Sequence, residues 1–245
     1  LETFGSQDVI AREKSTLVDN LASGGVAILN ADDPLVSKMG AGRPEITRIL
    51  AGLNAGELRA TNLKYDTTGT HFKVTVEGEE FDFQTRLLGA HNVSNLILAV
   101  GVAHHLGIRP TTMALAAKSI EPVEHRLELK QAGDLFVIDD AFNSNPVGAK
   151  NAVEILGQFE GRHRIIITPG MIELGEIEAD ENRIFGNAIG NAALDLVILV
   201  GAERARPILE GIKEIQPETP HVKVVNSLYE ANEIAREFAR PGDVI

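Results

Sequence analysis

The stretch LFVIDDAFNSNPVGAKNAVEILGQF (residues 135–159) decides the fold class. A short apolar run ends in two acids, and a segment with helical periodicity begins at Pro146. The same alternation follows in RIIITPG (164–170), LDLVILVG (194–201) and HVKVVN (221–226), each succeeded by a helical pattern. Strands that alternate with helices specify a parallel sheet flanked by helices and joined by right-handed crossovers. The sequence therefore predicts an α/β domain with a mostly parallel sheet.

The first half of the chain has a different pattern. A helix with one apolar face precedes VAILN (26–30), an apolar run typical of a buried parallel strand. From about residue 46 to 88, apolar and polar residues alternate between Gly and Asp turns, which predicts antiparallel strands or hairpins. Pro122 and charged residues then interrupt the pattern, so we predict two domains, 1–124 and 125–245. The helices of the first domain are expected at 7–22, 89–108 and 111–120, the last with a Thr at its N-cap.

Composition excludes several classes of function. The chain has 245 residues and a net charge of −12, which argues against a broad nucleic-acid surface because such surfaces need clustered Lys and Arg. It has no cysteine, so disulfides and thiolate metal sites are excluded. No apolar run is long enough to span a bilayer and no signal peptide is visible, so we expect a cytoplasmic location without membrane insertion. The seven histidines show no metal-ligand spacing.

Two polar clusters are candidates for ligand binding. In HNVSN (91–95), Asn92 and Asn95 lie three residues apart near one helix face, and their amides suit the edge of an adenine. Helix capping is the simpler explanation of these residues taken alone. Asp139 and Asp140 follow an apolar strand, where α/β sheets bind ligands, and they suit a ribose hydroxyl pair or a metal. A polar turn with a cap is the alternative.

Three further features are weaker on their own. Arg126, beside the predicted domain junction, could reach a phosphate, although a solvated charge is the plainer explanation. Lys14 lies on a polar helix face, where lysines are usually solvated. The loop TPGMIELG (168–175) has the position of a substrate loop, which ordinary strand-to-helix loops share. The sequence has neither a GxxxxGK[ST] phosphate loop nor a GxGxxG fingerprint.

Taken in order, these segments resemble the Mur ligase family over nearly the whole chain. The similar stretches are FGSQDVIAREKSTLVDNLASGGVAILNADDP, GAHNVSNLILAVGVAHHLGI, EHRLELK, VIDDAFNSNPVGAKNAVEIL and TPGMIELGE. The resemblance implies part of the family's ATP-binding central domain, followed by its Rossmann-like C-terminal domain. It also implies that the upstream domain, the phosphate loop and the end of the C-terminal domain lie outside the sequence. DDAFNSNP and TPGMIELG depart from the family's commoner DYAH and GDM patterns, which indicates a divergent branch.

The resemblance also implies residue roles. Asn92 and Asn95 match the asparagines beside the adenine, and Asp140 matches the aspartate that holds the ribose. Arg126 matches an arginine that approaches the nucleotide, and Asn143 falls where many relatives carry a His near it. Lys14 matches the catalytic lysine that several relatives carbamylate to help hold Mg²⁺.

The function that the resemblance implies is ATP-dependent amide-bond formation in peptidoglycan precursor synthesis. The closest pattern is that of the branch joining D-Ala-D-Ala to UDP-MurNAc-tripeptide through an acyl phosphate, with ATP and Mg²⁺. We expect a monomer that is inactive as this fragment. The alternatives are a folylpolyglutamate, cyanophycin or lipid II amidating ligase of the same fold, and a non-catalytic nucleotide-binding module.

Overall fold

The computed structural model describes residues 6–141, 145–219 and 221–245, which form two compact units. The first unit comprises Leu1–Lys64, Thr70–Arg86 and Ala90–Ile120. The second comprises Glu121–Ile245 together with Tyr65–Gly69 and Leu87–Gly89. The predicted division at 124/125 stays a prediction, because contacts group two short early segments with the second unit.

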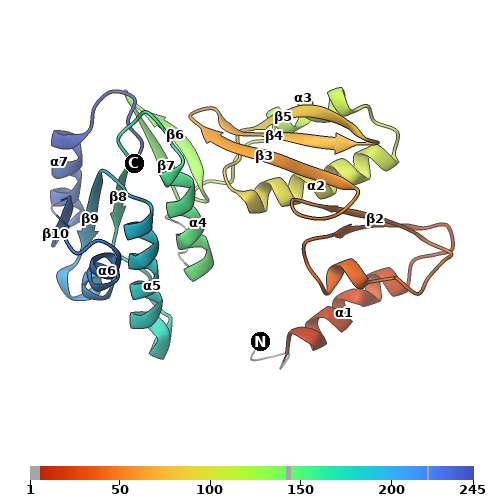
Figure 1. The fold of residues 1–245 in the computed structure, drawn as a ribbon, viewed down its shortest axis with the longest axis horizontal. Helices are drawn as coiled ribbons and strands as arrows, with labels where there is room; N and C mark the ends of the chain where they lie inside the picture. The colour runs from red at the N-terminus through yellow and green to blue at the C-terminus, as the bar shows by residue number, and fades with distance from the viewer. Residues whose placement is uncertain (1–5, 142–144, 220) are drawn as a thin grey trace. The chain divides into compact units, whose positions relative to one another are not determined.

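The first unit is built on one five-stranded sheet in the order β1-β2-β3-β4-β5 (Figure 1). Helices α2 and α3 contact this sheet, α2 at β1 and β2 and α3 at β5. The apolar residues of β1 alternate: Ile28 meets Gly101 of α2, whereas Ala27 and Leu29 pack with Val18 of α1. Both sides of β1 are therefore covered by side chains. The elements are α1 (Gln7–Asp19), β1 (Val26–Asn30), the 3₁₀ turn η1 (Val36–Lys38), β2 (Thr47–Gly52), β3 (Leu58–Asp66), β4 (Gly69–Val76), β5 (Glu79–Thr85), α2 (Ala90–His105) and α3 (Pro110–Lys118).

Two expectations for the first unit were wrong in part. β2 pairs parallel with both β1 and β3, and of the strands between residues 46 and 88 the pair β4 and β5 is antiparallel as predicted. A period-two pattern reports one buried face but carries no information on strand direction. α3 starts at Pro110 with Arg109 at its N-cap and no side-chain capping bond, so the Thr cap was also wrong. Proline is favoured at a first helical position because its missing N–H needs no partner there.

The second unit contains the predicted α/β series. Parallel strands β8, β9 and β10 form one sheet, and β6 and β7 form an antiparallel pair. Val244 forms parallel bridges with both Phe136 of β7 and Arg164 beside β8, so the last residues of the chain join the two sheets. The elements are β6 (Glu128–Ala132), β7 (Leu135–Asp139), α4 (Pro146–Gly157), β8 (Ile165–Thr168), η2 (Gly175–Ile177), α5 (Glu178–Asn191), β9 (Leu196–Val200), α6 (Ala202–Ile215), β10 (Val222–Val225) and α7 (Leu228–Phe238).

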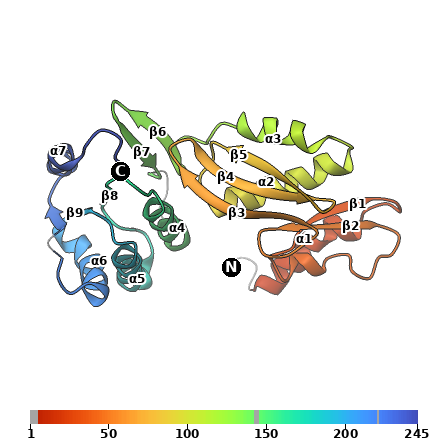
Figure 2. The same cartoon turned by 45° about the horizontal axis from the view of Figure 1, so that its top comes forward.

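Helices cover both faces of this second sheet. Figure 2 shows α7 on one side of β8 and β9 and α5 and α6 on the other. Along β9, Leu196 and Ile198 pack with α7, whereas Val197 and Leu199 belong to the core formed with α4, α5 and α6. A strand buried on both faces needs a continuous apolar run, which explains LVILV. No helix of the described residues has the length and apolar character needed to cross a membrane.

Candidate functional site

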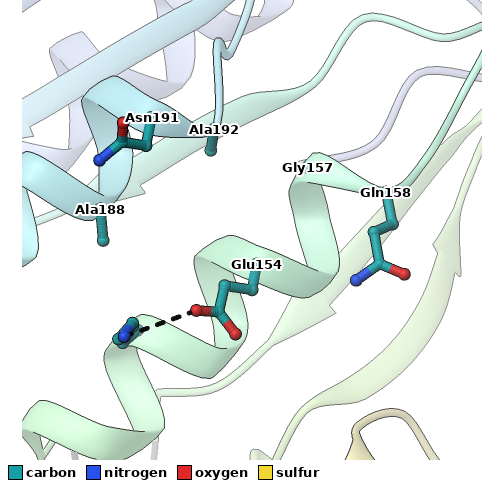
Figure 3. Close-up of a pocket in the computed structure, with 7 residues that line it drawn as sticks. Glu154, Gly157, Gln158, Ala188, Asn191 and Ala192 are labelled. Atoms are coloured by element: carbon teal, nitrogen blue, oxygen red, sulfur yellow. Dashed lines mark ion pairs between the residues drawn. The ribbon is translucent and has the colours of Figure 1, made fainter. Parts of the chain in front are cut away.

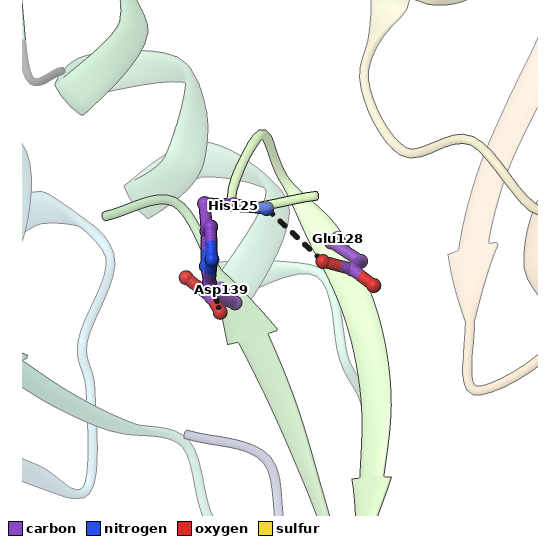
Figure 4. A group of neighbouring side chains, drawn as sticks. All are labelled: His125, Glu128 and Asp139. Carbon is purple, nitrogen blue, oxygen red and sulfur yellow. Dashed lines mark hydrogen bonds and ion pairs between the residues drawn. The ribbon is translucent and has the colours of Figure 1, made fainter. Parts of the chain in front are cut away.

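The predicted acidic site lies at the carboxyl end of β7. Asp139 is the last residue of that strand, and its carboxylate accepts a hydrogen bond from His125 Nδ1 at 2.8 Å (Figure 4). It also accepts from Lys130 Nζ at 2.8 Å. Lys130 Nζ also lies 2.9 Å from Glu128 Oε2. Glu128 and Lys130 are two residues apart along β6 and therefore lie on the same face of the hairpin. The site is thus a charged cluster of one Lys, one His and two carboxylates.

This cluster fixes its own charge state near neutral pH. Burial raises the pKa of Asp139, but hydrogen bonds from Lys130 and His125 outweigh burial and hold that pKa below its ordinary value. The hydrogen bond from Lys130, followed by that from the His125 amide, lowers the pKa of Glu128. The same contacts, with Asp139 first, raise the pKa of Lys130. Both carboxylates are therefore ionised and the ammonium is charged.

Ligand atoms of His125, Glu128 and Asp139 lie within 4.8 Å of one another, as a metal site requires. The ammonium of Lys130, however, contacts both carboxylates. A divalent cation would have to displace that ammonium and separate the ion pairs. The cluster is consequently a charge-compensated network rather than a ready cation site.

Asp140, the predicted ribose ligand, is half-buried directly after β7. Its Oδ1 accepts a hydrogen bond from the backbone amide of Leu127 at 3.1 Å. Leu127 and His125 both have left-handed backbone, with φ of 47° and 61°. Residues with a Cβ seldom adopt that conformation, and such strain concentrates at functional positions. Arg126 lies between these two residues and its side chain is exposed. The structure therefore places Asp140 and Arg126 in the same small region.

The remaining predicted residues are distributed as follows. Asn92 and Asn95 are the third and sixth residues of α2, which begins at Ala90, so neither occupies the N-cap position. Asn92 is half-buried and Asn95 is exposed. Lys14 is exposed in the middle of α1. Asn143 lies outside the described residues.

The loop after β8 is held by hydrogen bonds from Asn182, a residue that was not singled out from the sequence. Asn182 of α5 is 1% exposed, and its amide both accepts from Met171 N and donates to Met171 O, each at 2.9 Å. Met171 is buried, while Ile172 and Glu173 beside it are exposed.

Asn145 caps α4 by accepting from Gly148 N at 3.0 Å, and Pro146 starts that helix as predicted.

A surface groove of about 420 Å³ lies between α4 and α5 (Figure 3). Its lining extends to Gly157 and Gln158 at the carboxyl end of α4. In an α/β unit that end of the helix lies near the amino ends of the strands, opposite the edge where ligands bind. The groove contains an exposed ion pair of Lys150 and Glu154 at 3.8 Å and no further charged group. We assign it no part in the site.

Two family models match consecutive parts of the chain. The model for the Mur ligase middle domain matches residues 1–103, and the model for the Mur ligase glutamate ligase domain matches residues 125–245. The chain belongs to the Mur ligase family.

Individual Mur ligases agree with this assignment. The chain is 27% identical over 248 residues to UDP-N-acetylmuramoyl-tripeptide--D-alanyl-D-alanine ligase of Bacillus subtilis, covering 100% of this chain and 52% of the relative. It is 28% identical over 207 residues to the Escherichia coli ligase of the same name, covering 83% of this chain and 45% of that ligase. The chain thus spans about half the length of the curated Mur ligases it matches.

Solved structures of Mur ligases share the fold. A crystal structure of MurF from Acinetobacter baumannii superposes with a TM-score of 0.77 at 24% identity, covering 100% of this chain and 53% of that one. MurF from Thermotoga maritima in complex with ADP gives 0.72 at 18% identity, covering 98% and 54%. At these identities the likeness concerns the Mur ligase fold.

Proposed function

We propose that this chain is part of an ATP-dependent ligase that joins D-Ala-D-Ala to UDP-MurNAc-tripeptide. The observation that carries the proposal is the match to UDP-N-acetylmuramoyl-tripeptide--D-alanyl-D-alanine ligase of Bacillus subtilis. This match covers 100% of the chain and therefore includes both units. Both substrates belong to the reaction named for that relative, and the ADP complex of a Thermotoga maritima structural neighbour supports a nucleotide cofactor.

The second unit would contribute a ribose and phosphate site. A carboxylate has about four lone-pair sites, so Asp140 can hold the Leu127 amide and still accept from ribose hydroxyls. Its position directly after the carboxyl end of a strand, β7, is the usual one for nucleotides in α/β units. The exposed guanidinium of Arg126 would pair with a phosphate, for which its planar fork is suited.

The first unit would contribute adenine and metal ligands. Asn92 and Asn95 are inside α2 rather than at its cap, and their amides, which can both donate and accept, would read the adenine edge. The exposed amine of Lys14 is accessible for carbamylation, which would turn the cation into a carboxylate-like Mg²⁺ ligand. When bound, Mg²⁺ would neutralise charge on the transferring phosphoryl group.

The proposed chemistry is acyl transfer in two displacements. A carboxylate oxygen of the tripeptide attacks the γ-phosphorus, ADP leaves, and an acyl phosphate forms. The amine of D-Ala-D-Ala then attacks the acyl carbon, loses a proton, and expels phosphate to leave the amide. Such reactions depend mainly on positioning and on charge neutralisation. The side chains described here would orient the nucleotide for the first displacement.

A phosphate-release assay with a panel of amines tests this proposal. The natural gene product that contains this chain is mixed with ATP, Mg²⁺ and UDP-MurNAc-tripeptide, and then with D-Ala-D-Ala, D-glutamate or L-glutamate. We expect release that depends on D-Ala-D-Ala. Release with neither the tripeptide nor any amine would contradict the proposal, as would the complete absence of release.

One comparison favours a second candidate. The chain is also 28% identical over 256 residues to UDP-N-acetylmuramoylalanine--D-glutamate ligase of Pelotomaculum thermopropionicum, covering 100% of this chain. That enzyme's name specifies a different amine, D-glutamate, and a shorter UDP-sugar acceptor. Release that requires UDP-MurNAc-alanine and D-glutamate would establish this alternative. Nucleotide binding without phosphate release under any condition would indicate a non-catalytic module.

A further inference from the structure

We propose that Glu128, Lys130 and Asp139 form a clamp that positions Arg126 for a nucleotide phosphate. The inference rests on the proposed function for its ligand, but the clamp itself is a property of the second unit. It assigns Glu128 as a positioning residue that acts through Arg126 and does not touch the nucleotide.

The backbone is left-handed on both sides of Arg126. His125 has a φ of 61° and Leu127 a φ of 47°, so Arg126 lies between two residues with left-handed backbone. Two such residues with Cβ atoms so close together do not persist unless the surrounding structure enforces them. The turn therefore needs specific restraints, and those restraints define the direction in which Arg126 leaves the chain.

Hydrogen bonds and burial restrain both left-handed residues. Glu128 Oε2 accepts from the His125 amide at 3.0 Å, and Asp140 Oδ1 accepts from the Leu127 amide at 3.1 Å. The imidazole of His125 is held by Asp139 at 2.8 Å, whereas the Leu127 side chain is 5% exposed in the core. Each left-handed residue is thus fixed through both its amide and its side chain.

Lys130 links two of these restraining carboxylates. Its ammonium lies 2.9 Å from Glu128 and 2.8 Å from Asp139, so it couples the carboxylate that holds the His125 backbone to the carboxylate that holds the His125 ring. Without this cation, two carboxylates would face each other and repel. Lys130 therefore closes the network around the turn.

The consequence for binding is preorganisation. A flexible arginine loses backbone and rotamer freedom when it pairs with a phosphate, and that loss weakens binding. A turn that is already fixed removes the backbone part of the cost. The clamp should therefore strengthen binding of phosphate-bearing nucleotides and leave binding of the nucleoside unchanged.

The clamp itself is tested by amide hydrogen exchange in the natural gene product that contains this chain, with Glu128→Ala as the variant. We expect faster exchange at His125 and Leu127. Glu128→Gln, which keeps an acceptor oxygen, should restore part of the protection. Glu124→Ala, which removes an exposed acid from the same segment, should leave exchange unchanged. Unchanged exchange in Glu128→Ala overturns the clamp whatever the chain binds.

The functional half is tested by calorimetric titration of the same variants with ADP and with adenosine. Glu128→Ala should weaken ADP binding about tenfold, the effect of losing one charge-assisted contact, and leave adenosine binding unchanged. Combining it with Arg126→Ala should add no further loss, because both act on one contact. Equal losses for ADP and adenosine, or additive losses, overturn the positioning role. A wild-type chain that binds neither ligand overturns the proposed function and this role together, while the exchange data still decide the clamp.

Discussion

Asn182 satisfies both backbone polar groups of Met171, accepting from its N–H and donating to its C=O at 2.9 Å each. The same amide nitrogen also donates to the carbonyl of Glu178 at 2.9 Å. One buried side chain of α5 therefore ties down the loop that follows β8. Because this loop lies at the carboxyl end of a parallel strand, its rigidity bears on any ligand held at that edge.

Asn182→Ala should destabilise the second unit by about 2 kcal/mol, since it leaves a buried N–H and C=O of Met171 without partners. Urea unfolding monitored by circular dichroism measures this loss. Asn191→Ala is the matched control, because Asn191 lies on the same helix with an exposed bond to Asn187 O. We expect a change below about 0.5 kcal/mol there. Equal effects of the two substitutions would contradict the assignment.

Gly186→Ala should separate or destabilise α5 and α6. A Cβ at Gly186 would lie 2.1 Å from the backbone oxygen of Ile208, and a backbone atom cannot move aside as a flexible side chain can. Overpacking typically costs about 1–3 kcal/mol, which exceeds the gain of roughly 1 kcal/mol from replacing a helical glycine. Gly157→Ala is the control, because its nearest neighbour would be 3.5 Å away. Thermal unfolding should show a lower Tm for Gly186→Ala alone.

Stability should fall below about pH 4, and Asp243 should contribute to that fall. Burial raises the pKa of Asp243, but hydrogen bonds from the amides of Arg240 and His163 outweigh burial and hold the pKa below its ordinary value of 3.8. A carboxyl with a lowered folded pKa stabilises the fold above its unfolded pKa, and that stability is lost as pH falls through the folded pKa. Urea unfolding between pH 3 and 7 measures the slope.

Asp243→Asn should make the free energy of unfolding less dependent on pH over this acidic range. It should also lower stability at pH 7, because the carboxylate of Asp243 is buried and accepts from three groups. Asp134→Asn, on an exposed turn, should change neither quantity. A steep acid slope that survives in Asp243→Asn would assign the effect to other carboxylates.

Asp140→Asn should weaken adenosine binding by about tenfold, because an amide replaces the carboxylate proposed to hold the ribose hydroxyls. Asp134→Asn removes the same charge from the other end of the β6–β7 hairpin and should leave the affinity unchanged. Titration of both variants with adenosine makes the comparison. An equal loss of adenosine affinity in Asp140→Asn and Asp134→Asn would mean that Asp140 acts only through its contribution to the net charge.

The α/β order of the second unit was predictable because β7, β8, β9 and β10 are short, largely apolar runs, each followed by a helical pattern. LVILV could only be a strand covered on both faces, and it is. The parallel direction of β2 was not predictable, because one-sided alternation is the same in both directions. β6 was not expected either, because ELKQA is a short polar segment that is typical of a linker.

Only part of the candidate site was singled out from the sequence, and the roles given to its residues stay predictions. Asp139 and Asp140 stood out because two acids at a strand end have no simple structural explanation. Glu128 and Lys130 did not, although their spacing of two places them on one strand face once a strand is assumed. Asn182 gave no signal, because its partner Met171 is eleven residues away and no local pattern links a helix interior to the loop before it.

The most direct measurement follows the carboxylate oxygens of UDP-MurNAc-tripeptide. Both oxygens of the reacting carboxylate are labelled with ¹⁸O. The natural gene product is then supplied with this substrate, ATP, Mg²⁺ and D-Ala-D-Ala, and the ¹⁸O content of the released phosphate is measured by mass spectrometry. An acyl phosphate route predicts that one ¹⁸O enters the phosphate for each amide formed, and that omitting D-Ala-D-Ala stops turnover. Unlabelled phosphate would mean that water, not the carboxylate, attacks ATP, and would contradict the proposed ligase.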